Sequence, residues 1–224
     1  MMTLTASFAG AGIIVQKKDN VMMLKTPDFG YFSATTIAHI GDGFTIGMVL
    51  RAHSKAQPGD ILIDSRNPAL NTTAGVAIVV SDQRGLVLSL SDGQTLVELE
   101  TDGTCTAALD FASDPEKQYT QPHYVGFVVD AGPRIVRVLV DGVLCDGGAP
   151  SSMPRPLGTP AGHGFTFFDP LDGDSIRGGE DMRLTPSYGG EMVELQLYER
   201  ALLTSELVGN YRDCCVNANH TQIV

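Results

Sequence analysis

Apolar and polar residues alternate along much of the chain, and short turn sequences interrupt the alternation at regular intervals. In the segment FTIGMVLRAH, four apolar residues fall on one face: Phe44, Ile46, Met48 and Leu50. Alternation with a period of two residues is typical of a β-strand with one buried face. We therefore predict a strand here, with these four side chains in the core.

The segment GVAIVVSDQRGLVLSLSDGQTLVELETDG predicts a three-stranded meander. Its apolar runs cover 76–80, 86–90 and 95–101, and its turns lie at 82–85 and at Asp92-Gly93. An Asp-Gly pair between two alternating runs is a strong hairpin signal.

A second hairpin is predicted in HYVGFVVDAGPRIVRVLVDGVLCDGG. Its strands cover 124–130 and 134–140, Ala131-Gly132-Pro133 forms the turn, and Asp141-Gly142 begins another reversal. Many short strands joined by turns, with hardly any helical periodicity, indicate an antiparallel β-sandwich. The fold class we predict is all-β, with two antiparallel sheets.

The segment GGEMVELQLYERALLTSELVGNYR is predicted to be a strand followed by a short helix. Alternation from Met192 places Met192, Glu194, Gln196 and Tyr198 on one face, and Val193, Leu195 and Leu197 on the other. Beyond Tyr198 the spacing changes to three and four residues, at Leu203, Leu207 and Tyr211. This change predicts a helix, with Thr204 or Ser205 as its N-cap.

Length and charge restrict the function. The chain has 224 residues, which we interpret as one domain over 1–224 with a core at about 6–212. It carries 26 acidic and 15 basic residues and a net charge of −11, which disfavours nucleic acid and anionic lipid as partners. Apolar runs such as VAIVV and VGFVV have the length of strands, so no membrane insertion is expected.

The four cysteines leave the redox compartment open. Cys214 and Cys215 are adjacent and are not expected to pair with each other, whereas Cys105 or Cys145 is a candidate partner for one of them. The alternative is four free thiols. A bridge would suit an extracellular or cell-surface protein. The N-terminal segment MMTLTASFAGAGIIVQKK lacks a basic region before its apolar run and is not predicted to be a signal peptide.

Three segments together resemble laminin-G-like domains of the concanavalin A-like lectin/glucanase superfamily. They are ASFAGAGIIV, the hairpin HYVGFVVDAGPRIVRVLVDGVL, and the closing GGEMVELQLYERALL. In the last of these the positions that match are Gly190, Glu194, Leu197-Tyr198 and Ala201-Leu202. The resemblance implies a jelly-roll β-sandwich whose closing strand and helical turn pack on the core.

Two positions depart from the pattern of these domains. His123-Tyr124 stands where a tryptophan commonly leads the hairpin, and the chain has no tryptophan. Val193 stands where an aspartate commonly precedes Glu194. If that aspartate helps to hold calcium in some relatives, this chain lacks the ligand.

Carboxylates at alternating strand positions are the signature of glycosidases in this superfamily. VELETD places Glu98, Glu100 and Asp102 on one strand face, and Glu194 is a further candidate. The order of these residues differs from the laminarinase-type pattern. A solvated strand face in an acidic chain gives the same alternation, so we predict no catalytic residue and keep these as the weaker hypothesis.

Two groups of residues are candidates for a binding site. The acidic run DPLDGDSIRGGED offers oxygen ligands for Ca²⁺, a cation held by six to eight oxygens: Asp169, Asp172, Asp174 and Asp181. The second group offers an aromatic surface and hydrogen-bond donors to a sugar: Tyr188, Phe168, Arg177 and Arg183. Function on a rigid sandwich is usually carried by loops of this kind.

We therefore predict a non-catalytic recognition module that binds a carbohydrate or glycoprotein ligand, with calcium as a candidate cofactor. It would form part of a larger secreted or cell-surface protein. The first alternative is a protein–protein adhesion module that uses a loop face or an exposed sheet edge. The second is a glycoside hydrolase or lyase with carboxylates on the concave sheet, because one fold hosts all three functions.

Overall fold

The computed structural model describes most of the strands and the C-terminal helix. The described residues are 14–18, 21–25, 31–33, 43–51, 56–66, 74–101, 105, 109, 121–145, 165–167, 181–184, 189–198 and 200–217. The candidates Tyr188, Phe168, Arg177, Asp169, Asp172 and Asp174 lie outside them.

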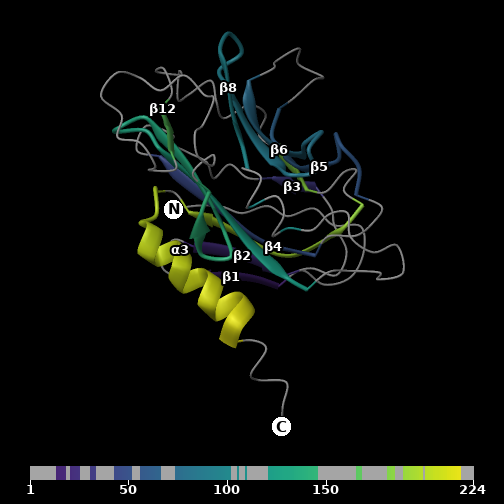
Figure 1. Ribbon diagram of the computed structural model, residues 1–224, viewed down its shortest axis with the longest axis vertical. Coiled ribbons are helices and arrows are strands. Elements are labelled where there is room, and N and C mark those ends of the chain that lie inside the picture. Colours follow the sequence, from purple (N-terminus) through teal and green to yellow (C-terminus); the bar gives the residue numbers. More distant parts are fainter. Residues whose placement is uncertain are drawn as a thin grey trace.

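Two antiparallel sheets form a β-sandwich, as predicted (Figure 1). Among the described residues, the first sheet has eight strands. Their order is β1 (Ile14–Lys18), β2 (Val21–Lys25), β14 (Glu191–Tyr198), β4 (Phe44–Arg51), β9 (His123–Asp130), β10 (Ile135–Val140) and β11 (Val143–Leu144), with β12 (Phe165–Phe167) also paired to β10. The second sheet has six described strands, in the order β3 (Tyr31–Ser33), β13 (Asp181–Leu184), β5 (Ile61–Asp64), β6 (Gly75–Val80), β7 (Leu86–Ser91) and β8 (Leu96–Glu100).

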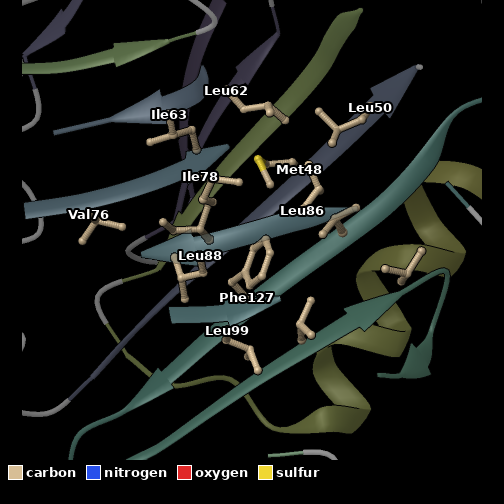
Figure 2. Close-up of a cluster of buried hydrophobic side chains, with 14 of the residues drawn as sticks. Met48, Leu50, Leu62, Ile63, Val76, Ile78, Leu86, Leu88, Leu99 and Phe127 are labelled. Carbon is tan, nitrogen blue, oxygen red and sulfur yellow. The ribbon is translucent and has the colours of Figure 1, made fainter. Parts of the chain in front are cut away.

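The core lies between the two sheets. Met48 and Leu50 on β4 and Phe127 on β9 point toward apolar side chains of the second sheet, among them Leu62, Ile63, Ile78, Leu86 and Leu88 (Figure 2). The four residues predicted to share the core face of the β4 segment are all buried. Close packing of this kind is the main contribution to stability in a sandwich.

Both predicted hairpins form, and their turns follow from local chemistry. At the end of β10, Asp141 and Gly142 have φ values of 51° and 77°, the backbone of a tight two-residue reversal. The connection between β7 and β8 is longer than predicted, because it spans Asp92–Thr95 rather than Asp92-Gly93. The carboxylate of Asp92 accepts hydrogen bonds from the backbone N–H groups of Gln94 and Thr95 at 2.8 and 2.6 Å.

The alternation predicted for β14 is wrong at its first residue. A β-bulge between Met192 and Glu194 shifts the register, so Met192 faces the core together with Leu195 and Leu197. Glu194 and Gln196 occupy the other face, beneath the C-terminal helix. A bulge inserts one extra residue into a strand. The side chains before the bulge therefore point to the opposite face of the sheet from the one that simple alternation predicts.

The C-terminal helix α3 (Thr204–Tyr211) forms where predicted and continues as the wider π-helical turns of η3 (Arg212–Asn217). It covers the face of the eight-stranded sheet that points away from the six-stranded sheet (Figure 1). The predicted cap is wrong: the N-cap is Leu203, whose N–H donates to the Glu206 carboxylate at 2.8 Å. Leu203 is exposed, whereas Leu207 is fully buried against the sheet.

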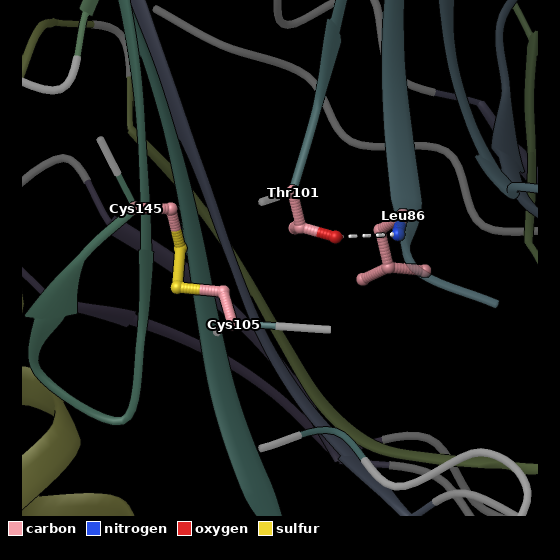
Figure 3. Close-up of a disulfide and its surroundings, with 4 residues drawn as sticks. All are labelled: Leu86, Thr101, Cys105 and Cys145. Carbon is pink, nitrogen blue, oxygen red and sulfur yellow. Dashed lines mark hydrogen bonds between the residues drawn. A yellow bond between two sulfur atoms is a disulfide. The ribbon is translucent and has the colours of Figure 1, made fainter. Parts of the chain in front are cut away.

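The cysteine pairing also differs from the prediction. Cys105 and Cys145 form a disulfide (Figure 3). Cys214 and Cys215 take part in no disulfide. Cys105 and Cys145 both belong to the core between the sheets, whereas Cys214 and Cys215 lie with the helix on the outer side of the eight-stranded sheet. A sheet therefore separates the two pairs, which rules out the bridges that we considered from sequence.

Candidate functional site

A row of residues crosses the outer face of the six-stranded sheet. Cross-strand pairing aligns one residue from each of the six strands: Tyr31, Arg183, Asp64, Ala77, Ser89 and Glu98. Residues that pair directly across antiparallel strands have their side chains on the same face of the sheet. We call this set the cross-strand row.

The cross-strand row faces away from the core. Its neighbours in sequence, Ile78, Leu88 and Leu99, belong to the buried cluster between the sheets. Because successive side chains of a strand point to opposite faces, Ala77, Ser89 and Glu98 point outward. Helix α3 covers the outer face of the other sheet, so the cross-strand row and the helix lie on opposite sides of the sandwich.

An ion pair lies near the middle of the cross-strand row. The carboxylate of Asp64 is buried and accepts hydrogen bonds from the backbone N–H and from Nε of Arg66, each at 2.9 Å. The side chain of Arg66 is 35% exposed, so its guanidinium covers the carboxylate while part of it remains open to solvent. Arg183 lies opposite Asp64 in the register, on the neighbouring strand β13.

Glu98 ends the cross-strand row at the edge of the sheet. Its Oε1 accepts a hydrogen bond from the hydroxyl of buried Ser89 at 2.9 Å, while the glutamate itself is exposed. Glu100, two residues further along β8, shares the same face and is half-buried. This end of the row therefore presents carboxylate oxygens to solvent.

The structure brings together some of the residues that sequence analysis selected and separates others. Arg183 pairs with Asp64 in the register and therefore belongs to the cross-strand row, and Asp181 lies two residues before it on β13. Glu194 lies in the other sheet, buried beneath α3. The three carboxylates considered for catalysis, Glu98, Glu100 and Glu194, therefore do not form one site.

Glu194 belongs instead to a buried polar cluster between β14, β9 and the helix. Its Oε1 accepts hydrogen bonds from Nε2 of Gln196 at 2.7 Å and from the thiol of Cys214 at 3.6 Å. The side-chain amide of Asn210 reaches three oxygens of the same cluster: the Tyr198 hydroxyl at 2.8 Å, Gln196 Oε1 at 3.1 Å and the Tyr124 hydroxyl at 3.2 Å. These contacts hold the helix in place, because buried polar groups are costly without partners.

Burial changes the acid–base properties of this cluster. Removal from water raises the pKa of the Tyr124 and Tyr198 hydroxyls, and the hydrogen bond from Asn210 opposes the change. Burial, together with the charge of Glu194, raises the pKa of the Cys214 thiol to about 12. A thiol with so high a pKa stays protonated at neutral pH and is a poor nucleophile.

Across the described ranges, no three His, Cys, Asp or Glu side chains gather closely enough to hold a metal ion. The predicted calcium ligands fall outside those ranges except for Asp181, which begins β13. No helix among the described residues is long and apolar enough to cross a membrane.

Sequence reasoning missed four residues of this face: Tyr31, Asp64, Arg66 and Ser89. For Ser89 a local signal exists, because the β7–β8 hairpin sets it opposite Glu98 once the four-residue connection is recognised. Tyr31 and Asp64 reach the row only through pairing with β13, which is distant in sequence. No local pattern reveals such a contact.

No protein-family model matches the chain, and no curated protein matches it. Solved structures with a similar fold are binding domains of botulinum neurotoxins. The serotype D/C VPI 5993 binding domain has 12% identity and a TM-score of 0.53 over 86% of this chain. The neurotoxin DC binding domain in complex with rat synaptotagmin II has 12% identity and a TM-score of 0.54 over 90% of it.

The same binding domain in complex with SialylT gives 12% identity and a TM-score of 0.53. This chain covers 40 to 42% of the length of these three structures. At this level of identity the likeness concerns the fold, a β-sandwich of two antiparallel sheets. It identifies neither a ligand nor a family.

Proposed function

We propose that the chain is a non-catalytic, laminin-G-like recognition module that binds carbohydrate on the outer face of its six-stranded sheet. The observation that carries the proposal is the cross-strand row, in which Arg183, Asp64, Ser89 and Glu98 follow one another across neighbouring strands. Buried Asp64 and Ser89 hold two groups that reach solvent, the partly exposed guanidinium of Arg66 and the exposed carboxylate of Glu98, and these suit sugar hydroxyls. In the register, Tyr31 of β3 pairs with Arg183 at the far end of the row.

The segments that flank β13 extend the proposed site. Asp169, Asp172, Asp174 and Arg177 precede this strand, whereas Tyr188 follows it. In the proposal, the aspartates hold a calcium ion, and Tyr188, Phe168, Arg177 and Arg183 contact the sugar. Calcium sites formed from loop carboxylates and backbone carbonyls are well suited to this role.

The structural neighbours support a binding function by analogy alone. One is titled as a complex with SialylT, and another title states that cell entry of the toxin depends on interaction with two ganglioside molecules. The disulfide between Cys105 and Cys145 supports the proposed secreted or cell-surface location, because such bonds persist in oxidising compartments.

The glycosidase alternative has less support. Glu98 and Glu100 lie on the edge strand β8, and the third candidate, Glu194, is buried in the other sheet. Catalytic carboxylates of glycosidases instead flank a sugar bound between them, with one of them kept protonated by its surroundings.

Calorimetric titration with a panel of neutral and sialylated oligosaccharides, in calcium and in EDTA, tests the proposal. We expect one glycan class to bind, with at least a tenfold weaker Kd for Arg183→Ala and for Glu98→Gln. The matched control is Asp82→Asn, which removes a charge from an exposed turn of the same sheet. Equal affinity in all four proteins, or no binding to the panel, would overturn the proposed site.

A further inference from the structure

Alternate backbone hydrogen-bonding groups of β8 point away from the six-stranded sheet. The N–H of Thr101 donates to the carbonyl of Leu86 at 2.9 Å, and that of Asp92 donates to Thr95 at 3.3 Å. In an antiparallel pair, alternate residues exchange these bonds with the neighbouring strand. The backbone groups therefore point toward β7 at Val97, Leu99 and Thr101. They point away from the sheet at Leu96, Glu98 and Glu100.

No described strand covers the outer edge of β8, and side chains of this strand reach solvent. Within the described part of the chain, β8 pairs with β7 and with no other strand. Leu96 is 59% exposed, one of the few large apolar side chains on the surface that the structure describes. Exposed strand edges are templates for another chain, and proteins usually cover or interrupt them.

We propose that β8 binds an extended basic segment of a partner protein, which adds to the six-stranded sheet as a further strand. The three residues with outward backbone groups also carry the side chains of the outer face, so Glu98 and Glu100 would lie beside the partner's side chains. Lysine or arginine at alternate positions of the partner would pair with these carboxylates across the new strand pair.

Charge favours such a partner over a second copy of the chain. Two copies paired through β8 would bring two Glu98 and two Glu100 side chains onto one face of adjacent strands, and like charges across a strand pair are destabilising. The net charge of −11 adds to this repulsion and attracts a basic segment. The proposal does not depend on carbohydrate binding, because it uses the backbone of an edge strand.

Fluorescence anisotropy with a labelled nonapeptide of alternating lysine and valine tests strand addition. In the proposed register, the lysine amides point toward β8 and the valine amides point away. N-methylation of the lysine amides should therefore weaken binding at least tenfold, whereas N-methylation of the valine amides should change it less than threefold. Composition and charge are the same in both peptides, so a difference between them reports backbone pairing.

Variants of β8 give the reciprocal test. Leu96→Pro removes an outward N–H at the first residue of an edge strand, where proline is tolerated, and should weaken binding at least tenfold relative to Leu96→Ala. The double variant Glu98→Lys/Glu100→Lys should lose the lysine peptide and bind a glutamate–valine peptide. Arg183→Ala should leave peptide binding unchanged, which separates this result from the carbohydrate test.

Three results would overturn the proposal. Equal affinity for the two methylated peptides would mean that charge alone attracts the peptide to β8, without the addition of a strand. Absence of binding by any of the peptides would mean that Glu98 and Glu100 protect the edge from association. Sedimentation of the wild-type chain as a dimer that Leu96→Pro converts to monomer would mean that a second copy occupies the edge. If Leu96→Pro does not fold, the comparison of the two methylated peptides on the wild-type chain decides.

Discussion

Gly126 on β9 lies directly beneath Leu207 on α3, so closely that a β-carbon on the glycine would lie 2.8 Å from Cδ2 of the leucine. Its register partner on β4, Gly47, is similarly close to the hydroxyl of Tyr124, at 2.6 Å from a β-carbon. These paired glycines leave the space on the outer face of the eight-stranded sheet in which the helix side chain and the tyrosine ring pack.

Gly126→Ala should therefore destabilise the protein. The added methyl group forces Leu207 out of its position, and overpacking of this kind costs about 1–3 kcal/mol. The matched control is Gly209→Ala in α3, where a β-carbon has nothing within 4 Å. Because alanine favours a helix over glycine, that variant should gain up to about 1 kcal/mol. Urea denaturation measures both, and equal stability of the two variants would contradict the packing described for Leu207.

The strands and hairpins of the fold could be predicted because their signals are local. Alternation in 44–50 requires one buried face, and Asp92 satisfies nearby backbone N–H groups to form its turn. The bulge in β14 could not be predicted, because Val193 is an ordinary strand residue and the displacement depends on its partner strand. Disulfide pairing also required knowledge of which side of a sheet each cysteine occupies.

Two residues of the proposed site were named from the sequence, in different roles: Arg183 as a sugar contact and Glu98 as a weaker catalytic candidate. The register that sets them in one row with Asp64 depends on pairing between strands distant in sequence. Glu194 illustrates the opposite case. The sequence named it as a candidate catalytic carboxylate, whereas the helix that follows buries it with Gln196 and Cys214.

Asn210→Ala should loosen the helix. The variant leaves the Tyr198 hydroxyl, the Tyr124 hydroxyl and Gln196 Oε1 without the amide that contacts all three. Loss of one partner from a buried polar network costs about 1–3 kcal/mol. Ser205→Ala, at an exposed position of the same helix, is the control and should change stability by less than about 0.5 kcal/mol. Similar melting temperatures for the two variants would mean that the network contributes little.

The thiols of Cys214 and Cys215 should make the free energy of unfolding depend on pH. Burial raises the pKa of Cys214 to about 12 and that of Cys215 to about 11, from an ordinary value of 9.0. The folded protein therefore retains thiol protons that the unfolded chain loses, and this contribution to stability is present below about pH 9. It decreases as the pH rises from 9 toward 11 and 12.

Urea denaturation between pH 7 and pH 10.5 measures the effect, with Cys214→Ala/Cys215→Ala as the control. The decline in stability above pH 9 should be shallower in the double variant. Maleimide labelling at pH 8 should be roughly a hundredfold slower in the native protein than in the unfolded chain. Rapid labelling of both thiols under native conditions would contradict the packing of η3 against the eight-stranded sheet.

Calcium should raise the melting temperature if the aspartates around β13 bind it. A ligand that binds only the folded state stabilises it in proportion to the logarithm of its concentration, by about 2.7 kcal/mol at a hundred times Kd. The double variant Asp172→Asn/Asp174→Asn should abolish the shift, and Asp82→Asn should retain it. An identical melt in calcium and in EDTA would remove calcium from the proposed function and leave the cross-strand row unaffected.

The disulfide should provide a large part of the stability of the sandwich. Cys105 follows β8 at the edge of one sheet, and Cys145 follows β11 at the edge of the other, so the bond links the two sheets across the core. It closes a loop with a sequence separation of 40 residues. The loss of chain entropy in the unfolded state then corresponds to about 4 kcal/mol.

Cys105→Ala/Cys145→Ala should lower the free energy of unfolding by about this amount, less any gain from relaxed packing. Reductant should lower the melting temperature of the wild-type chain and leave that of the double variant unchanged. Insensitivity of the wild type to reductant would show that the bond adds little, and would weaken the argument for an oxidising compartment.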